Sequence, residues 1–382
     1  MNKHYDAIVI GARVAGSATA LGLARGGAKV LLVDRAPFIG DTLSTHALMR
    51  PAARLLQAWG LLERATKDAA LVDATTFNYA GESVRIPIKP TPGLPGLYAP
   101  RRLVLDRVMC DAAIEAGAEL ALGLSCADLL HRPDGRVAGV VLRDRDGRTR
   151  TVRSDLVVGA DGRASTVAEL AGAETRVHST KAASTIYTYV GGLENRGYQW
   201  YYGVGAAAGL FPTGDGLHCL FTSCRPAEFR QRLGVGGFQD LTRLFGTWEP
   251  ELAAKIAEAG PVEKMRRYPG APGHIRQATG PGWALVGDAG FFKDPATAHG
   301  ISDAFLDADR LSRAWLSGTG SLFPYECARD RHALSIFRTT QEIAALDCNM
   351  DRLKALHMEL SHCMKAEAME LEDILAPKAL AA

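Results

Sequence analysis

A glycine-rich turn near the start of the chain has the composition of a diphosphate site. It follows an apolar run at residues 7–10 and precedes an expected helix. A glycine at a strand end permits a tight turn, and free N–H groups at the start of the next helix can bind pyrophosphate oxygens. The residues assigned to this contact are Gly11, Arg13, Val14, Ala15 and Gly16. Arg13 stands where the usual G-x-G-x-x-G pattern has its middle glycine.

Asp34 could bind the sugar next to that diphosphate. A second apolar run, residues 30–33, ends in Asp34 and Arg35. A carboxylate at this distance from the glycine turn can accept hydrogen bonds from a ribose diol. The turn, Asp34 and Arg35 together predict a site for an ADP-containing cofactor.

Two later segments repeat the order of strand, glycine and acid. Residues 156–165 contain an apolar run that leads into Asp161 and Gly162, and residues 284–288 contain another that ends at Asp288. Three such elements in one chain are much more specific than a single glycine-rich turn.

In this order the three elements resemble those of the FAD-dependent monooxygenases of the aromatic-hydroxylase type, a group that includes geranylgeranyl reductases and flavin halogenases. The resemblance spans residues 5–340 in motif order. It implies FAD, with the diphosphate on the glycine turn, the adenosine ribose on Asp34 and the ribityl or diphosphate side on Asp288. It also implies that Asp161 and Gly162 serve the pyrophosphate region and help to dock NADPH or NADH, the electron donor.

The same resemblance assigns further residues to the cofactor. Arg102 fits a family position at a helix start, an arginine in an R-x-x-L pattern, with Arg101 as the fallback. Residues 295–301 would pass beneath the isoalloxazine ring, and amides opening the next helix could stabilise negative charge on the reduced ring. The remaining assigned contacts are Thr45, His46, Cys126, Pro295, His299, Gly300 and Ile301.

The chain departs from the family pattern at several positions. Ala298, Ser302 and Phe291 stand where family members commonly have Gly, Asn and His. Ala168 and Glu169 replace the arginine that usually closes the Asp-Gly motif, so a carboxylate stands in place of a cation suited to a phosphate-bearing cofactor.

His46 is the candidate catalytic residue. By resemblance its segment crosses near the flavin ring, and a histidine with a pKa near 6.5 could move a proton at neutral pH. The alternative is that His46 only hydrogen-bonds backbone or flavin. The sequence shows no catalytic triad and no metal-ligand cluster, and Lys293 and Asp294 are expected to be a surface or loop-anchoring pair.

These residues predict an FAD-dependent oxidoreductase. Monooxygenation makes few demands on side chains, because the cofactor carries the chemistry while the protein excludes water and orients the substrate. We therefore expect an NAD(P)H- and O₂-dependent monooxygenase of an apolar small molecule, with an aromatic compound as one option. Two alternatives stay open: a reductase or dehydrogenase of a carbon–carbon double bond, and a flavoprotein that binds a ligand or partner without turnover.

Composition argues against some other classes. The 44 Lys and Arg residues against 42 Asp and Glu give a formal charge of +2, without a basic block that could follow a phosphate backbone. A nucleic-acid partner is therefore not expected. No apolar run approaches the about 20 residues of a membrane-spanning helix. A first strand that begins by Tyr5 leaves no room for a signal peptide, so we expect a cytoplasmic protein without stable membrane insertion.

The pattern predicts an α/β fold: a Rossmann-like three-layer FAD-binding domain with an inserted antiparallel-sheet substrate domain and C-terminal helices. The FAD-binding domain is expected in three pieces, at residues 1–75, 101–180 and 272–320. A proline-rich loop and substrate-domain segment is expected at 76–100, and the substrate-binding sheet at 181–271.

Two apolar patterns in the sequence do not determine what the apolar side chains contact. Tyr187 and Tyr189 share one strand face, as do Trp200 and Tyr202, so these rings either line an apolar pocket or pack across strands. In the helices expected over 321–382, apolar residues recur at spacings of three, four and seven. Those helices either face the core or form a homodimer.

Overall fold

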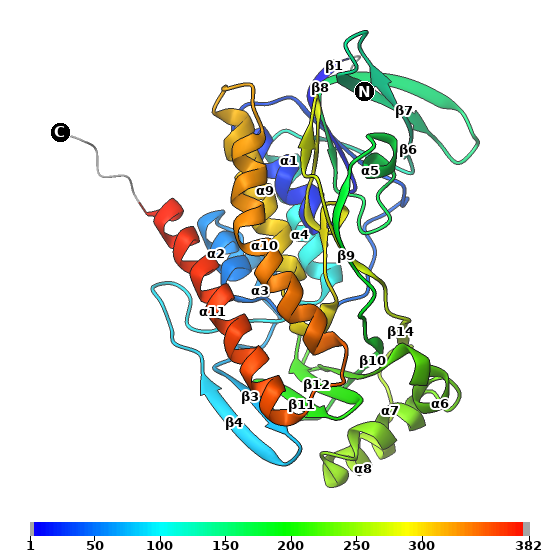
Figure 1. Ribbon diagram of the computed structural model, residues 1–382, viewed down its shortest axis with the longest axis vertical. Helices are drawn as coiled ribbons and strands as arrows, with labels where there is room; N and C mark the ends of the chain where they lie inside the picture. Colours follow the sequence, from blue (N-terminus) through cyan, green and yellow to red (C-terminus); the bar gives the residue numbers. More distant parts are fainter. Residues whose placement is uncertain (1–3, 377–382) are drawn as a thin grey trace, which may run out of the picture.

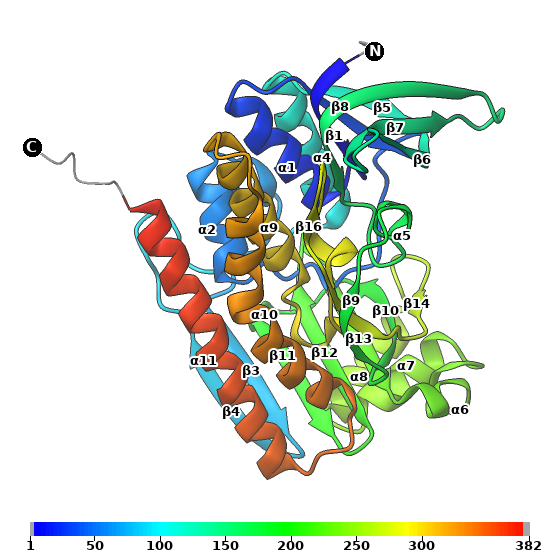
Figure 2. The ribbon, with the colours of Figure 1, turned by 45° about the horizontal axis from the view of Figure 1, so that its top comes forward.

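The computed structural model describes residues 4–376, and its two larger β-sheets lie in different parts of the molecule (Figure 1). Long helices near the end of the chain run beside both sheets, as a second view also shows (Figure 2). No helix among these described residues is long and apolar enough to cross a membrane.

The first sheet is mainly parallel and carries the glycine-rich turn. β1 pairs with β2 on one side and with β8 on the other, while β5 and β17 extend the sheet, all in parallel. The apolar residues of β1, β2, β8 and β17 are buried on both faces, as is typical of parallel sheets. The bounds are β1 (His4–Ile10), β2 (Val30–Asp34), β5 (Glu119–Leu122), β8 (Thr149–Gly159), β16 (Thr279–Gly280) and β17 (Trp283–Leu285).

Helices cover one face of this sheet and a β-hairpin covers the other. Val9 and Leu32 pack among α1, α4 and α9, whereas Ile8 and Leu31 pack among residues of β6 and β7. β7 also pairs antiparallel with the first part of β8. The bounds are α1 (Val14–Arg25), α4 (Arg102–Glu115), α9 (Gly300–Leu316), β6 (Ser125–His131) and β7 (Val137–Arg143).

The second sheet draws on two distant parts of the chain. Its order is β14-β10-β13-β12-β11-β3-β4, and only the β11–β3 pair is parallel. β3 and β4 lie within residues 74–87, so the sheet already begins inside the piece expected to end at 75. The strands also occupy part of the expected loop and substrate-domain segment at 76–100. The bounds are β3 (Ala74–Tyr79), β4 (Glu82–Pro87), β10 (Ser184–Val190), β11 (Tyr198–Gly203), β12 (Ala206–Pro212), β13 (His218–Cys224) and β14 (Arg266–Tyr268).

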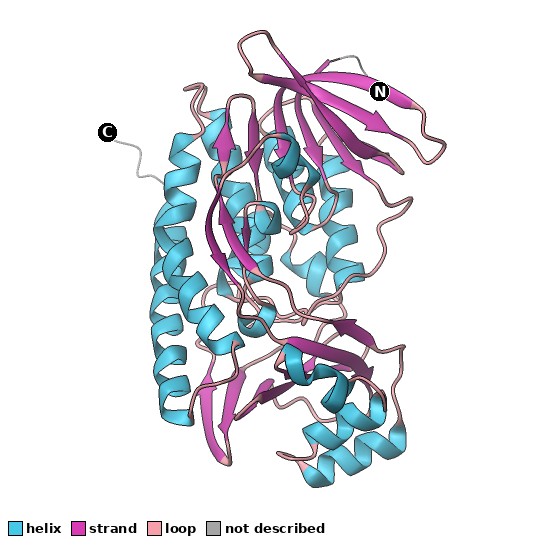
Figure 3. Cartoon of the chain, turned by 45° about the vertical axis from the view of Figure 1, so that its right-hand side comes forward, coloured by secondary structure: helices cyan, strands magenta, loops and turns pink. Residues whose placement is uncertain are grey.

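The sheet expected over 181–271 is interrupted by helices, which corrects that prediction. Phe238, Leu241 and Phe245 are spaced three and four apart, so they form one helical face, and Pro250 begins the next helix. These helices pack on the outer face of the second sheet, where Tyr201 lies, and form a separate group in Figure 3. Their bounds are α6 (Phe229–Leu233), α7 (Phe238–Phe245) and α8 (Pro250–Ala259).

The expected C-terminal helices are α10 (Phe323–Ala344) and α11 (Met350–Leu375). Leu353, Leu356 and Leu360 of α11 are buried against the aromatic face of the second sheet. These apolar residues therefore face the core of a single chain, and the homodimer stays an expectation. The remaining elements are α2 (Arg50–Ala58), α3 (Leu62–Thr66), α5 (Thr166–Leu170), β9 (Thr175–Ser179), β15 (Gly273–Arg276) and β18 (Phe291–Phe292).

Replacing Gly16 with alanine tests the packing between β1 and α1. A Cβ at Gly16 would lie 1.7 Å from the carbonyl oxygen of Gly11, so the turn would have to open. We expect Gly16→Ala to lower the free energy of unfolding by about 1–3 kcal/mol or more, measured by urea denaturation. Gly191→Ala is the matched control, because its Cβ would meet its nearest neighbour at an ordinary 3.5 Å. Equal stability of the two variants would contradict this packing argument.

Candidate functional site

A cavity of about 720 Å³, called cavity 1 below, lies at the carboxyl ends of β1, β2, β8 and β17. The three glycine-acid elements meet there, as expected for an open parallel sheet. Its volume is within the range of about 300–1,000 Å³ typical of ligand sites. The predicted cofactor contacts that line it are Gly11, Arg13, Val14, Ala15, Asp34, Arg35, Thr45, Arg102, Cys126, Asp161, Gly162, Asp288, Pro295, Gly300 and Ile301. Gly16, His46 and His299 do not line it.

Two helix N-termini direct N–H groups at cavity 1. Gly11 adopts a φ of +107°, which glycine tolerates better than other residues. The first turn of α1 has no side-chain cap, and within residues 4–376 the amides of Val14 and Ala15 have no hydrogen-bond acceptor. α9 begins at Gly300 beside the same cavity, also without a side-chain cap. Unpaired donors and positive dipole ends favour an anionic group at this place.

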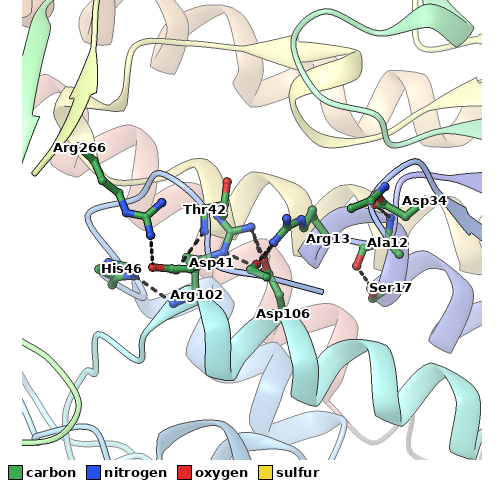
Figure 4. Close-up of polar contacts among 12 residues, drawn as sticks. Ala12, Arg13, Ser17, Asp34, Asp41, Thr42, His46, Arg102, Asp106 and Arg266 are labelled. Carbon is green, nitrogen blue, oxygen red and sulfur yellow. Dashed lines mark hydrogen bonds and ion pairs between the residues drawn. The ribbon is translucent and has the colours of Figure 1, made fainter. Parts of the chain in front are cut away.

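Asp34 holds the glycine turn as well as lining cavity 1. Its Oδ2 accepts a hydrogen bond from the backbone N–H of Ala12 at 2.8 Å, and its Oδ1 accepts one from Ala36 at 2.8 Å (Figure 4). Each carboxylate oxygen keeps a further lone pair. Asp34 can therefore fix the turn and still accept a hydroxyl donor from a ligand.

Arg13 and Arg102 share one buried carboxylate beside cavity 1 (Figure 4). Nη1 of Arg13 lies 3.0 Å from Oδ2 of Asp106, and Nε of Arg102 lies 2.9 Å from Oδ1. Asp106 is fully buried, so a single negative charge balances two guanidinium groups. Within this three-residue cluster the positive charges exceed the negative charge by one, and the arginine in place of the motif's middle glycine supplies part of that excess.

The two later motifs contribute in different ways. Asp161 caps α5, since its Oδ2 accepts the N–H of Thr166 at 2.7 Å, while the side chain of Asp288 is accessible from cavity 1. Glu169, which replaces the family's arginine, is exposed and does not line the cavity. Arg163 does line it and supplies a cation that sequence reasoning did not assign.

Lys293 and Asp294 are buried in the wall of cavity 1, so the expectation of a surface pair is wrong. Lys293 forms an ion pair with Asp303. Asp294 accepts hydrogen bonds from the N–H groups of Ala183 at 2.8 Å and Ala296 at 3.0 Å, which fits the loop-anchoring alternative. Burial raises the pKa of Asp294 to about 7.

The turn that follows contains one departure from the family pattern. Ala298 has a φ of 51°, a left-handed conformation in which glycine is the unstrained residue. The next residue, His299, turns inward. Its Nδ1 lies 3.0 Å from Asp303 and its Nε2 lies 3.4 Å from Glu367 of α11. The side chain of His299 is therefore a buried link between α9 and α11, and the cofactor contact of this residue stays a prediction.

His46 is a buried hydrogen-bonding residue, and the premise that its pKa is near 6.5 is wrong. Its Nδ1 accepts the backbone N–H of Arg102 at 3.1 Å, so its Nε2 carries the proton and donates to the hydroxyl of Tyr189 at 2.5 Å. Burial, with the positive charges of Arg102, Arg101 and Arg266, lowers the pKa of His46 well below its usual value. This geometry favours the alternative of a structural role.

A second cavity of about 630 Å³, cavity 2, lies between the inner face of the second sheet and α11. Its aromatic wall is Phe77, Tyr79, Trp200 and Tyr202, in which the Phe77–Trp200 and Trp200–Tyr202 rings are within 9° of parallel. Tyr187 and Tyr189 do not line it, because they pack against His46 instead.

Two segments separate the cavities and contribute to both walls. Ala47 lines cavity 1 while Met49 lines cavity 2. In the same way Pro295 and Ala298 line cavity 1 while Thr297 lines cavity 2. A ligand in cavity 2 would therefore lie next to one in cavity 1.

Part of the wall of cavity 2 was not predictable from the sequence. Phe77 and Tyr79 lie in the segment expected as a loop and substrate-domain segment. They are two residues apart within residues 74–79, a spacing that is typical of a strand. His357 lies on α11 with no local pattern that marks it as a ligand contact. Only the tertiary structure brings it against the sheet.

Comparison with known proteins identifies relatives of the chain. Residues 4–192 match a family described as FAD binding domain. The chain is 30% identical to the menaquinone reductase of Mycolicibacterium smegmatis, over 86% of this chain and 80% of that protein. It is 28% identical to digeranylgeranylglycerophospholipid reductase 2 of Methanothermobacter thermautotrophicus, over 81% and 82%. PqsL, described as a probable FAD-dependent monooxygenase from Pseudomonas aeruginosa, shares the fold with a TM-score of 0.75 at 19% identity, covering 95% of this chain and 100% of that one.

The pH dependence of stability tests the state of His46. A histidine whose pKa is lowered by folding binds its proton less well in the folded state, so its stability contribution is present above pH 6.5 and is lost as the pH falls below that value. His46→Asn keeps a residue that accepts the positive φ of 66°. We expect this variant to be less stable than the parent by about 1–3 kcal/mol at pH 7.5, and the difference to narrow towards pH 5 in urea denaturation. His362→Asn, on the exposed side of α11, is the control. A difference that widens on acidification would contradict a neutral His46.

Proposed function

Because the chain belongs to the FAD-binding-domain family of oxidoreductases, we propose that it is an FAD-dependent monooxygenase that uses NAD(P)H and O₂ to oxygenate an apolar, aromatic small molecule. The observation that carries this proposal is the position of cavity 2, whose aromatic wall lies beside cavity 1. When bound, FAD supplies the electron-transfer and oxygen-activating chemistry. The chain's own residues bind, orient and exclude water.

The residues of cavity 1 fit FAD. The unpaired amides of Val14 and Ala15 and the excess positive charge of Arg13 and Arg102 suit a diphosphate. Asp34 keeps lone pairs for ribose hydroxyls. A Cβ built at Gly300 meets nothing within 4 Å, so the space beside the α9 N-terminus is open. This N-terminus would stabilise negative charge on a reduced ring, as a fixed dipole can.

Cavity 2 suits an apolar substrate. The buried rings of Trp200 and Tyr202 exclude water from its wall, which limits side reactions at a neighbouring cofactor. The His46–Tyr189 hydrogen bond fixes the segment leading to Met49 at the boundary of the two cavities. Monooxygenation requires no further acid or base from this wall.

Reduction of a carbon–carbon double bond is the second candidate. The similarity to the menaquinone and digeranylgeranylglycerophospholipid reductases favours it. The exposed side chains of Val84, Ile86 and Met358 line the outer part of cavity 2 and would suit a long apolar chain. This reaction consumes two electrons and two protons, and no oxygen.

Oxygen dependence distinguishes the two candidates. We expect the protein to bind one non-covalent FAD, and to consume one O₂ per NAD(P)H with a suitable aromatic compound from a panel of aromatic and terpenoid compounds. With ¹⁸O₂ the product should gain one labelled atom, measured by mass spectrometry. A saturated product formed under nitrogen would support the reductase and refute the monooxygenase. A flavin-loaded protein without turnover in either assay would refute both.

Replacing Asp34 tests the assignment of cavity 1. Asp34→Ala removes the ribose acceptor and leaves the N–H groups of Ala12 and Ala36 unpaired. We expect FAD to bind about ten- to a hundredfold more weakly and the protein to unfold at a lower temperature. Asp6→Ala is the matched control, because Asp6 also accepts a backbone N–H, that of Lys29 at 2.7 Å, but lies outside cavity 1. FAD affinity measured by equilibrium dialysis should be unchanged in that control. An equal loss in both variants would mean that Asp34 has no direct part in binding.

A further inference from the structure

An unpaired nitrogen lies against the aromatic wall of cavity 2. His357 of α11 lines this cavity, and its Nδ1 is hydrogen-bonded to the hydroxyl of Tyr79 at 2.7 Å. No group among residues 4–376 lies within hydrogen-bonding distance of its Nε2. The hydroxyl of Tyr202, whose ring centroid is 4.8 Å from that of His357, has no partner in the same part of the chain either. Both residues line cavity 2, so these two polar groups are available to hydrogen-bond a ligand there.

The position of His357 is fixed by its neighbours. Its ring centroid lies 5.3 Å from that of Phe77 and 5.7 Å from that of Tyr79, so it packs against two strand residues as well as Tyr202. The Tyr79 hydrogen bond sets the rotation of the imidazole. Leu356 and Leu360 hold α11 against the same sheet face. The ring is therefore already oriented before any ligand arrives.

We propose that His357, held by Tyr79, is a substrate-binding residue whose Nε2 hydrogen-bonds an uncharged oxygen, a hydroxyl or carbonyl, on an otherwise apolar ligand in cavity 2. This inference rests on the proposed function, in that the ligand is the substrate placed beside cavity 1. It adds a specificity element, because it selects compounds with an oxygen at one position over purely hydrocarbon ones of the same shape.

The charge state of the site fits an uncharged oxygen. Burial lowers the pKa of His357 to about 4, so the ring is neutral at pH 7 and can serve as donor or acceptor according to its tautomer. Arg50, Lys354 and Lys365 also line cavity 2. Arg50 donates a hydrogen bond to the carbonyl oxygen of Lys89 at 2.7 Å, and Lys354 is paired with Glu82 at the surface. A buried wall built of rings penalises an unpaired ion, whereas a neutral hydroxyl can be satisfied by one hydrogen bond.

Two probes of similar shape test this inference at pH 7 with the purified, flavin-loaded protein. The probes are 2-naphthol and 2-methylnaphthalene, which differ in the hydrogen-bonding oxygen. We expect His357→Phe to weaken naphthol binding about three- to tenfold and to leave methylnaphthalene binding within about twofold, by equilibrium dialysis. Tyr79→Phe keeps both rings and should weaken naphthol binding selectively but less, so it serves if His357→Phe does not fold. His362→Phe is the matched control, an exposed histidine of the same helix that does not line the cavity.

Each other result has a definite meaning. Equal losses for both probes, or no loss for either, would overturn the role of His357 and leave the function of cavity 2 intact. If the parent protein bound neither probe, cavity 2 would not be an apolar ligand site, and both the inference and the proposed placement of the substrate would be wrong.

Discussion

The arrangement of the site depends on the buried carboxylate of Asp106. It holds Arg13 of the glycine turn and Arg102 at the start of α4, and the backbone N–H of Arg102 in turn donates to His46. The imidazole of His46 is in turn hydrogen-bonded to the hydroxyl of Tyr189 on the second sheet. One line of polar contacts thus connects the two sheets. Removing one partner from a buried ionic cluster typically costs about 3–5 kcal/mol, because a charge is left uncompensated.

Most polar side chains around cavity 1 also have a structural role. Asp34 fixes the glycine turn, Asp161 caps α5, and Asp294 anchors residues 183 and 296. What is left for a ligand is mainly backbone amide, surplus positive charge and unused lone pairs. Cavity 2 has the opposite composition, with few polar groups in a wall of rings. The walls of the two cavities therefore suit different ligands, a polar one in cavity 1 and an apolar one in cavity 2.

Local signals explain how much of this could be read from the sequence. The glycine turn, the acid motifs and the C-terminal helices were predictable, because each is defined by residues close together in the chain. The wall of cavity 2 was not, since residues 75–79, 200–202 and 357 meet only after folding. The pKa of His46 was misjudged for the same reason: burial and three arginines from other segments set it. The helices α6 to α8 were not predicted, because the flanking segments have strand patterns. The spacing of Phe238, Leu241 and Phe245 is nevertheless helical.

The ion pairs that hold α11 make the wall of cavity 2 sensitive to the salt concentration of the surrounding solution. Besides its apolar face, α11 is held by several ion pairs. Two of them have partly exposed side chains, Glu372 with Arg54 at 2.6 Å and Lys354 with Glu82 at 2.6 Å. Dissolved salt screens such pairs over a Debye length of about 8 Å at physiological ionic strength, and leaves apolar contacts in place. A rise in ionic strength therefore weakens two of the contacts that hold α11, which forms part of the wall of cavity 2. The carboxylate of Asp106 beside cavity 1 is fully buried, so salt screens its pairs with Arg13 and Arg102 less.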